Sequence, residues 1–327
     1  MGRARAVGVP ICLAGVSRPT HHTSQGASLI LTALWMMFTA CGDAPASAVR
    51  GPLDVHALSF PAAWVAERIG GDRVHVTVFP PAGADPSFWQ PPPEGVASLT
   101  KADLIVAVGA GYEAWTATAA LPDPRVVHLA KGADLIQLAA THHSHGAQGA
   151  HEHVGVDPHI WLDPELLGAS AMALAERLAI ADPAGNPAYF EAAKRLLVEV
   201  KAVDDAWRDA LGALEGAEVA ANHPTWSYWA RRYGFSVRVF DVAPDQAPAP
   251  EVVAAVQAWQ AAHPAGRFLW ESPPAPATLA ALPGLRSIVL DPLEQPAASG
   301  RYDWLAGARA DLDVLRHELP PVNQARQ

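Results

Sequence analysis

Short apolar runs alternate with stretches of helical periodicity along most of the chain. In the first half, the runs have the length of β-strands, and the stretches between them repeat apolar residues every three or four positions. The expected strands are residues 55–60, 74–79, 104–108 and 126–129, and the expected helices are 62–69, 96–100 and 164–181. Gly109-Ala110-Gly111 marks a turn that we expect to open a further helix. This alternation predicts βα units and a mostly parallel sheet.

One amphipathic helix is longer than its neighbours. From residue 188 to about 214, the apolar positions follow one another at intervals of three or four, which places them on one helix face. They are Leu196, Val200, Val203, Trp207, Leu211 and Leu214. About 27 residues of helix extend roughly 40 Å, which is more than one small domain needs. We therefore predict a strut that joins two halves of the chain.

The alternation of strands and helices resumes after this helix. Strands are expected at residues 218–221, 236–242, 268–270 and 287–290, with helices at 225–233, 251–262 and 304–315. The chain is thus predicted to have an α/β fold, with two Rossmann-like lobes that contain mostly parallel sheets and are joined by one long rigid helix. The predicted boundaries are an N-terminal lobe at 53–181, the linking helix at 182–216 and a C-terminal lobe at 217–327.

The N-terminus has the features of an export signal. Residues 28–40 form an uncharged, mostly apolar run that is too short to span a bilayer, and arginines but no acidic residues precede it. Phe38-Thr39-Ala40-Cys41 resembles a bacterial lipobox, although Phe stands where Leu is usual, which favours signal cleavage over lipidation. A buried N-terminal helix is the competing interpretation. We predict a signal peptide at 1–41, a tether at 42–52 and an exported protein that is periplasmic, or membrane-anchored if Cys41 is lipidated.

Composition and charge narrow the possible partners. Half of the 327 residues are hydrophobic, 17% are charged, and the formal net charge is −10. An acidic surface repels phosphate backbones, so we expect no nucleic-acid partner. The two cysteines, Cys12 and Cys41, both fall in the predicted signal and leave no disulfide pair for the exported protein. We expect a monomer.

Histidine is concentrated in one short segment. Residues 141–153 contain a cluster of the chain's histidines, namely His142, His143, His145, His151 and His153. Imidazole is the commonest protein ligand for borderline-soft divalent metals. We predict a flexible, metal-collecting auxiliary loop, with a solvent-exposed polar loop of no cellular role as the alternative.

Further candidate ligands stand where strands are expected to meet helices, the edge at which open α/β sheets bind ligands. They are Asp85 in residues 80–91, His159 in 157–164, His223 in 222–229 and Asp291 in 289–293. Two imidazoles and a carboxylate suit Zn²⁺, which takes such ligands at about 2.0–2.2 Å. Each also has a purely structural explanation: His159 as a buried histidine, His223 as a helix cap and Asp291 as a turn former.

Taken together, these segments resemble the metal-specific solute-binding proteins of bacterial ABC importers for zinc and manganese. The likeness covers about residues 53–317 and is carried by 157–164, His223 with its aromatic neighbours and Tyr233-Gly234, the helix after Asp182-Pro183, and Leu290-Asp291-Pro292-Leu293. The resemblance implies two lobes joined by a rigid helix, with metal bound between them and delivered to an ABC permease and its ATPase. It also implies that His159, His223 and Asp291 occupy three of four ligand positions. A His-rich loop is typical of the zinc-preferring members.

The first ligand position departs from that family. The family usually has Gly-Ala-Asp-Pro-His there, and this chain has Gly83-Ala84-Asp85-Pro86-Ser87. Asp85, a water molecule or a loop histidine can complete the site, and Glu271, after the strand at 268–270, is a further carboxylate candidate. We expect three protein ligands completed by water or a loop histidine. Zn²⁺ is the expected metal, with Mn²⁺ and Fe²⁺ as alternatives because oxygen ligands change selectivity.

The predicted function is high-affinity binding of a divalent metal outside the cytoplasm, for uptake and not for catalysis. A zinc-dependent hydrolase that uses the same His/His/Asp cluster is the alternative. Against it, the sequence has no His-Glu-x-x-His motif, no Gly-x-Ser-x-Gly elbow and no phosphate-binding Gly-Lys-Ser/Thr loop. An adhesion or assembly role is a third possibility, which the sequence does not separate from transport.

Overall fold

The computed structural model describes residues 51–81, 83–84, 88–144, 150–296 and 300–319, and the side chains of 139–154 lie outside that description. The predicted signal, with Cys41, and the tether up to residue 50 lie outside the described residues, as do Asp85, Ser87 and His145. Within the described part, no helix is both long and apolar enough to cross a bilayer.

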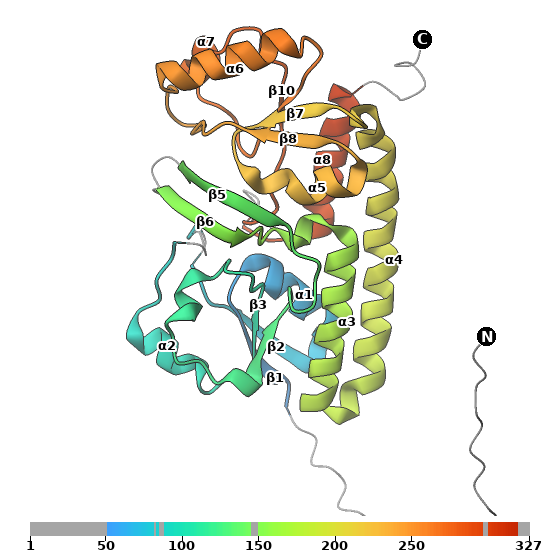
Figure 1. Cartoon of the computed structure of the whole chain (residues 1–327). Helices are drawn as coiled ribbons and strands as arrows, with labels where there is room; N and C mark the ends of the chain where they lie inside the picture. The colour runs from blue at the N-terminus through green and yellow to red at the C-terminus, as the bar shows by residue number, and fades with distance from the viewer. Residues whose placement is uncertain (1–50, 82, 85–87, 145–149, 297–299, 320–327) are drawn as a thin grey trace, which may run out of the picture. The chain divides into compact units, whose positions relative to one another are not determined.

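The first half of the described chain folds around a parallel sheet (Figure 1). Its strands are β1 (Leu53–Ala57), β2 (Val74–Val78), β3 (Leu104–Ala107) and β4 (Val126–His128), in the order β2-β1-β3-β4. The helices of this half are α1 (Phe60–Gly70), α2 (Pro93–Leu99) and α3 (Pro164–Ala181). Strand β3 is buried along its whole length, as expected for a continuous apolar run inside a parallel sheet.

A second parallel sheet forms the other half. Its strands are β7 (Glu218–Ala221), β8 (Ser236–Val239), β9 (Phe268–Trp270) and β10 (Ser287–Val289), in the order β10-β9-β7-β8. Its helices are α5 (Ser227–Tyr233), α6 (Pro250–Ala262), α7 (Pro276–Ala281) and α8 (Trp304–Glu318). In both sheets the first strand lies between the second and the third, so the two halves share one topology. The predicted α/β fold with two mostly parallel sheets is confirmed.

Helix α4 (Asn186–Leu211) links the two halves (Figure 1). It packs against α1 and α3 of the first half and against α8 of the second. The predicted apolar face is buried at Leu196, Val200, Val203, Trp207, Leu211 and Leu214. Burial of one such aliphatic side chain contributes roughly 1.5–3 kcal/mol. The predicted linking helix is confirmed, whereas the lobe boundaries at residues 181 and 216 stay predictions.

The turn after β3 opens no α-helix, so that prediction is wrong. Gly109, Ala110 and Gly111 have φ values of 79°, 54° and 83°, which a right-handed helix does not tolerate. The buried Glu113 accepts hydrogen bonds from two backbone N–H groups at the start of the turn, at 2.9 and 3.0 Å. Only a short 3₁₀ turn, Ala114–Ala117, follows. The spacing of apolar residues does not reveal the sign of φ, which the two glycines leave open.

Much of the His-rich segment lies in a β-hairpin. Strands β5 (Gln137–Ser144) and β6 (Ala150–Val156) pair antiparallel, with His143 opposite His151 and Thr141 opposite His153. These two segments of the predicted loop therefore form paired strands, and the flexibility of the segment stays a prediction. Composition indicated the ligand chemistry, but pairing of backbone N–H and C=O groups determines the local structure.

Candidate metal centre

Two candidate ligands lie at the middle of the carboxyl edge of the second sheet. His223 follows β7 and Glu271 follows β9, and these two strands are hydrogen-bonded neighbours. The strand order reverses here, because β8 pairs with one edge of β7 and β9 with the other, and ligands bind at such points in open α/β sheets. Asn222 joins the two loops, because its Nδ2 donates to Glu271 Oε1 at 3.5 Å and its Oδ1 accepts from Glu271 N at 3.2 Å. The topology thus brings together residues far apart in sequence.

His159 is fixed by its own segment. Its backbone N–H and its Nδ1 both bond to Asp157 Oδ1, at 2.9 and 2.7 Å. The apolar residues after it, Ile160–Leu162, form a buried 3₁₀ turn. Asp163 then caps α3 by accepting two backbone N–H groups of its first turn. The buried run Ile160–Leu162 therefore anchors the histidine in the protein interior.

Three hydrogen bonds attach the His159 segment to the second half of the molecule. Tyr228 OH donates to Asp157 O at 2.8 Å, and Trp161 Nε1 donates to Pro292 O at 2.8 Å. Trp304 Nε1 donates to Trp161 O at 2.9 Å. Breaking one of these buried bonds would leave an unsatisfied polar group at a cost of about 1–3 kcal/mol. The two halves are thus held together at the level of the candidate ligands.

His159 and His223 meet in the protein interior. Their ring centroids lie 6.0 Å apart, and the residues are 3% and 2% exposed. A third group, Glu294, places its Oε1 3.0 Å from His159 Nε2. Glu294 is not among the ligands predicted from the sequence. The position of this carboxylate in the sequence, directly after Leu290-Asp291-Pro292-Leu293, could have indicated it.

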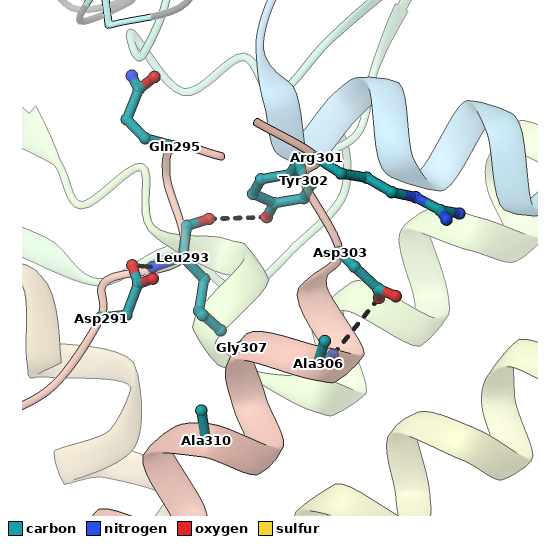
Figure 2. A pocket seen from close by; sticks show the side chains of 9 residues that line it. All are labelled: Asp291, Leu293, Gln295, Arg301, Tyr302, Asp303, Ala306, Gly307 and Ala310. Carbon is teal, nitrogen blue, oxygen red and sulfur yellow. Dashed lines mark hydrogen bonds between the residues drawn. The ribbon is translucent and has the colours of Figure 1, made fainter. Parts of the chain in front are cut away.

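A strained turn presents Glu294 to His159. Leu293 has φ 57°, in the left-handed region that costs roughly 1–2 kcal/mol for a residue with a side chain. Asp291 Oδ1 accepts from Leu293 N at 2.8 Å, and Tyr302 OH donates to Leu293 O at 2.7 Å (Figure 2). These two bonds offset the strain and hold the turn in place.

The side chain of Asp291 stabilises this turn. It lines a cavity of about 380 Å³ together with residues of α8 and the segment before it (Figure 2), and its backbone N–H donates to Asp311 Oδ1 at 2.9 Å. Among the described residues, the Asp291 carboxylate bonds to its own turn and to neither His159 nor His223. Its observed role is that of a turn former, and its assignment as a metal ligand stays a prediction.

The ionisable groups of the site shift one another's pKa values. Burial raises the pKa of Glu271 to about 7, and the Glu294 carboxylate adds to the rise while His159 opposes it. Burial alone would lower the pKa of His159, but the charges and hydrogen bonds of Asp157 and Glu294 raise it to about 10. The two carboxylates therefore favour the charged form of the imidazole in the metal-free protein. A divalent cation can supply the positive charge that the imidazole proton provides.

The residues that fit a metal are His159, His223 and Glu294, because two imidazoles and a carboxylate are ligands that Zn²⁺ accepts. Among the described residues, no three His, Cys, Asp or Glu side chains already stand in metal-binding geometry. Glu271 engages Asn222 and His223, and Asp85 lies outside the described residues. The side chains of the hairpin histidines also lie outside them. All these ligand assignments stay predictions.

The chain matches the family model described as ZnuA, zinc-uptake complex component A, periplasmic, over residues 55–317. It is 26% identical over 312 residues to the high-affinity zinc uptake system protein ZnuA of Bacillus subtilis, covering 89% of this chain and 96% of that protein. It is also 24% identical over 173 residues to the manganese-binding lipoprotein MntA of Halalkalibacterium halodurans, covering 52% of this chain and 54% of that protein.

Solved structures share the fold. The metal-dependent lipoprotein YcdH of Bacillus subtilis superposes with a TM-score of 0.69 at 23% identity, covering 82% of this chain and 99% of that one. Zn(II)-bound AdcA of Streptococcus pneumoniae gives a TM-score of 0.70 at 19% identity, covering 83% of this chain and 59% of that one. Because the family model spans most of the sequence, the chain belongs to the ZnuA family of periplasmic metal-binding components of ABC importers, which are solute-binding proteins and not enzymes.

Proposed function

We propose that this chain binds Zn²⁺ with high affinity outside the cytoplasm and delivers it to an ABC permease and its ATPase. The observation that carries the proposal is the buried pair His159 and His223, with rings 6.0 Å apart and Glu294 at the Nε2 atom of His159. Buried ionisable groups are costly unless their charges are compensated. A divalent cation between these side chains provides that compensation.

The distances favour a small rearrangement on binding. Two ligand atoms that share a tetrahedral Zn²⁺ at about 2.0–2.2 Å are separated by about 3.3 Å. His159 Nε2 and Glu294 Oε1 lie 3.0 Å apart. Once the proton between them leaves, opening this contact by a few tenths of an ångström admits the ion. His223 supplies the third ligand, and water, Asp85 or a hairpin histidine the fourth.

Zn²⁺ is the proposed metal, with Mn²⁺ or Fe²⁺ as the alternative. Sites of nitrogen and oxygen ligands bind Zn²⁺ more tightly than Mn²⁺ or Fe²⁺. The serine at position 87 removes one imidazole from the expected set, and the relatives include both a zinc uptake protein and a manganese-binding lipoprotein. Competition between Zn²⁺ and Mn²⁺ for the metal-stripped protein distinguishes these alternatives.

The remaining features of the proposal concern the N-terminus and the assembly. We propose that the protein works as a monomer and that lipidation of Cys41, where it occurs, anchors it to the membrane. Mass spectrometry of the exported protein tests the anchor, because a lipidated Cys41 adds the mass of acyl chains to the new N-terminus.

Calorimetry on metal-stripped protein tests the function. We expect one tight Zn²⁺ per chain, lost when both His159 and His223 are replaced by alanine. His263→Ala is the matched control, because His263 stacks on Trp259 in α6 and is not one of the proposed ligands. Absence of a tight binding event, or tight binding that survives the double replacement, would refute the proposal.

A further inference from the structure

Both histidines of the proposed site are held through their Nδ1 atoms. His159 Nδ1 lies 2.7 Å from Asp157 Oδ1, and His223 Nδ1 lies 2.6 Å from Thr225 Oγ1. Asp157 and Thr225 are 0% exposed, and the two histidines are 3% and 2% exposed. Both contacts are therefore shielded from solvent, and the surrounding protein fixes their geometry.

Thr225 connects His223 to a carboxylate. Its Oγ1 donates to Glu271 Oε2 at 3.3 Å, and the same carboxylate oxygen lies 3.2 Å from His223 Nδ1. A hydroxyl that donates its proton to a carboxylate offers only lone pairs to the imidazole, so it accepts the Nδ1–H of His223. Asn222 fixes the other oxygen of Glu271 through its amide.

Asp157 has the matching role at His159. An ionised carboxylate can only accept, so the contact with Asp157 requires a proton on His159 Nδ1. The same Asp157 oxygen accepts the backbone N–H of His159 at 2.9 Å, and Tyr228 holds the backbone carbonyl of Asp157. The carboxylate is thus fixed before any metal arrives.

We propose that Asp157 and the Thr225–Glu271 pair are positioning residues that keep the imidazole proton on Nδ1 and so present both Nε2 atoms to the metal. This inference rests on the proposed function, because it assigns the groups that orient the proposed ligands. A ligand histidine whose second nitrogen donates to such a partner keeps one tautomer and becomes a more basic ligand. Loss of the partner lowers metal affinity about 10- to 100-fold.

The first test compares Thr225→Val with Thr225→Ser, with Zn²⁺ affinity measured by chelator competition. Valine keeps the shape of threonine but removes the closer acceptor and leaves Glu271 Oε2, 3.2 Å from His223 Nδ1, so we expect an affinity loss of about tenfold, which serine largely restores. Asp157→Asn should retain more affinity than Asp157→Ala, because the amide oxygen still accepts. Thr278→Val is the matched control: this buried threonine in α7 donates its hydroxyl to Pro244 O and Gln246 O and not to a histidine, so its loss should lower the unfolding temperature but not the affinity.

The second test observes the tautomer directly in the unmodified protein. With isotope-labelled histidine and an NMR-active cadmium isotope in place of zinc, we expect two histidines whose Nε2 couples to the metal and whose Nδ1 carries a proton. Coupling of the metal to Nδ1 would overturn the inference. This measurement tests which nitrogen binds the metal even where Thr225→Val does not fold.

Failure of this inference and failure of the proposed function give different results. A wild-type protein without tight Zn²⁺ binding removes the proposed function and the inference with it. Tight wild-type binding that is unchanged in a folded Thr225→Val protein overturns the positioning role alone.

Discussion

At the scale of single residues, two carboxylates three positions apart have different surroundings. Glu294 contacts His159 Nε2, whereas Asp291 accepts the Leu293 N–H of its own turn. We expect Glu294→Gln to weaken Zn²⁺ binding by more than about 100-fold, beyond the loss typical of outer-shell partners. Asp291→Asn retains a turn-forming side chain and should cost much less. Calorimetry on both variants checks this, and a larger loss in Asp291→Asn would make Asp291 the ligand.

A second residue, Asp204, couples stability to pH. Burial raises its pKa, but Arg232 and Tyr233 outweigh burial through hydrogen bonds and charge, so the native pKa lies below its ordinary value. A carboxyl whose pKa is lowered in the native state stabilises the fold at pH values above its pKa in the unfolded chain, which is about 3.9. That contribution is lost as the pH falls through the native pKa.

We therefore expect Asp204→Asn to lower the free energy of unfolding by about 1.5–3 kcal/mol at neutral pH, because it removes the paired hydrogen bonds to the Arg232 guanidinium, which keeps its contacts with Asp163 and Glu165. The difference from wild type should narrow below about pH 4. Asp205→Asn is the control, since Asp205 is exposed and pairs only with Lys201 among the described groups, at a cost of at most about 1 kcal/mol. Urea denaturation as a function of pH measures both. A cost of Asp204→Asn that is constant down to about pH 3 would contradict this assignment.

At the scale of elements, helix α8 supports the turn that carries Glu294. A Cβ added at Gly307 would lie 2.5 Å from Leu293 Cδ2, so Gly307→Ala must displace the Leu293 side chain within that turn. A Cβ at Gly168 would meet Leu197 at the same distance, but between α3 and α4. Both variants should lose about 1–3 kcal/mol of stability through overpacking.

Only Gly307→Ala should also weaken metal binding, because Leu293 belongs to the turn that carries Glu294. We expect an affinity loss of about tenfold, which corresponds to about 1.4 kcal/mol of binding free energy. Denaturation and chelator competition on the two proteins separate the effects. Equal Zn²⁺ affinity in Gly307→Ala and Gly168→Ala would show that the turn does not set the position of a ligand.

We expect the β5–β6 hairpin to affect the rate at which the protein binds Zn²⁺ and not the affinity of the tight site. Its histidines can hold metal weakly and raise the local concentration near the site. Removal of residues 141–153 should slow loading at trace Zn²⁺ and leave the tight affinity within about threefold, a change of less than 1 kcal/mol. Stopped-flow loading and chelator competition measure the two quantities. A fall of the tight affinity by a factor of 100 would make a hairpin histidine a direct ligand.

At the scale of the whole molecule, one core passes through both halves. Val55 of β1, Trp207 of α4 and Leu290 after β10 belong to the same buried cluster. The Trp207 ring contacts the rings of Trp229 and Trp304, at centroid distances of 4.6 and 5.6 Å. The segments that carry His159 and His223 therefore pack on a core that spans both halves.

The sequence predicted the elements whose pattern repeats over many residues. The spacing from Leu196 to Leu211 specified the buried face of α4, and the strand–helix alternation specified the two sheets. It did not reveal Glu294, because a carboxylate 135 positions from His159 looks like any surface acid until the chain is folded. The turn at Gly109 and the β5–β6 hairpin depend on the sign of φ and on backbone pairing, which side-chain periodicity does not encode.

Anomalous diffraction at the zinc absorption edge, from crystals of the loaded protein, tests the metal site most directly. We expect one dominant peak about 2.0–2.2 Å from the Nε2 atoms of His159 and His223 and from a Glu294 oxygen. Weaker peaks beside the hairpin histidines are compatible with that result. Peaks at the hairpin alone, with no density between His159 and His223, would contradict it.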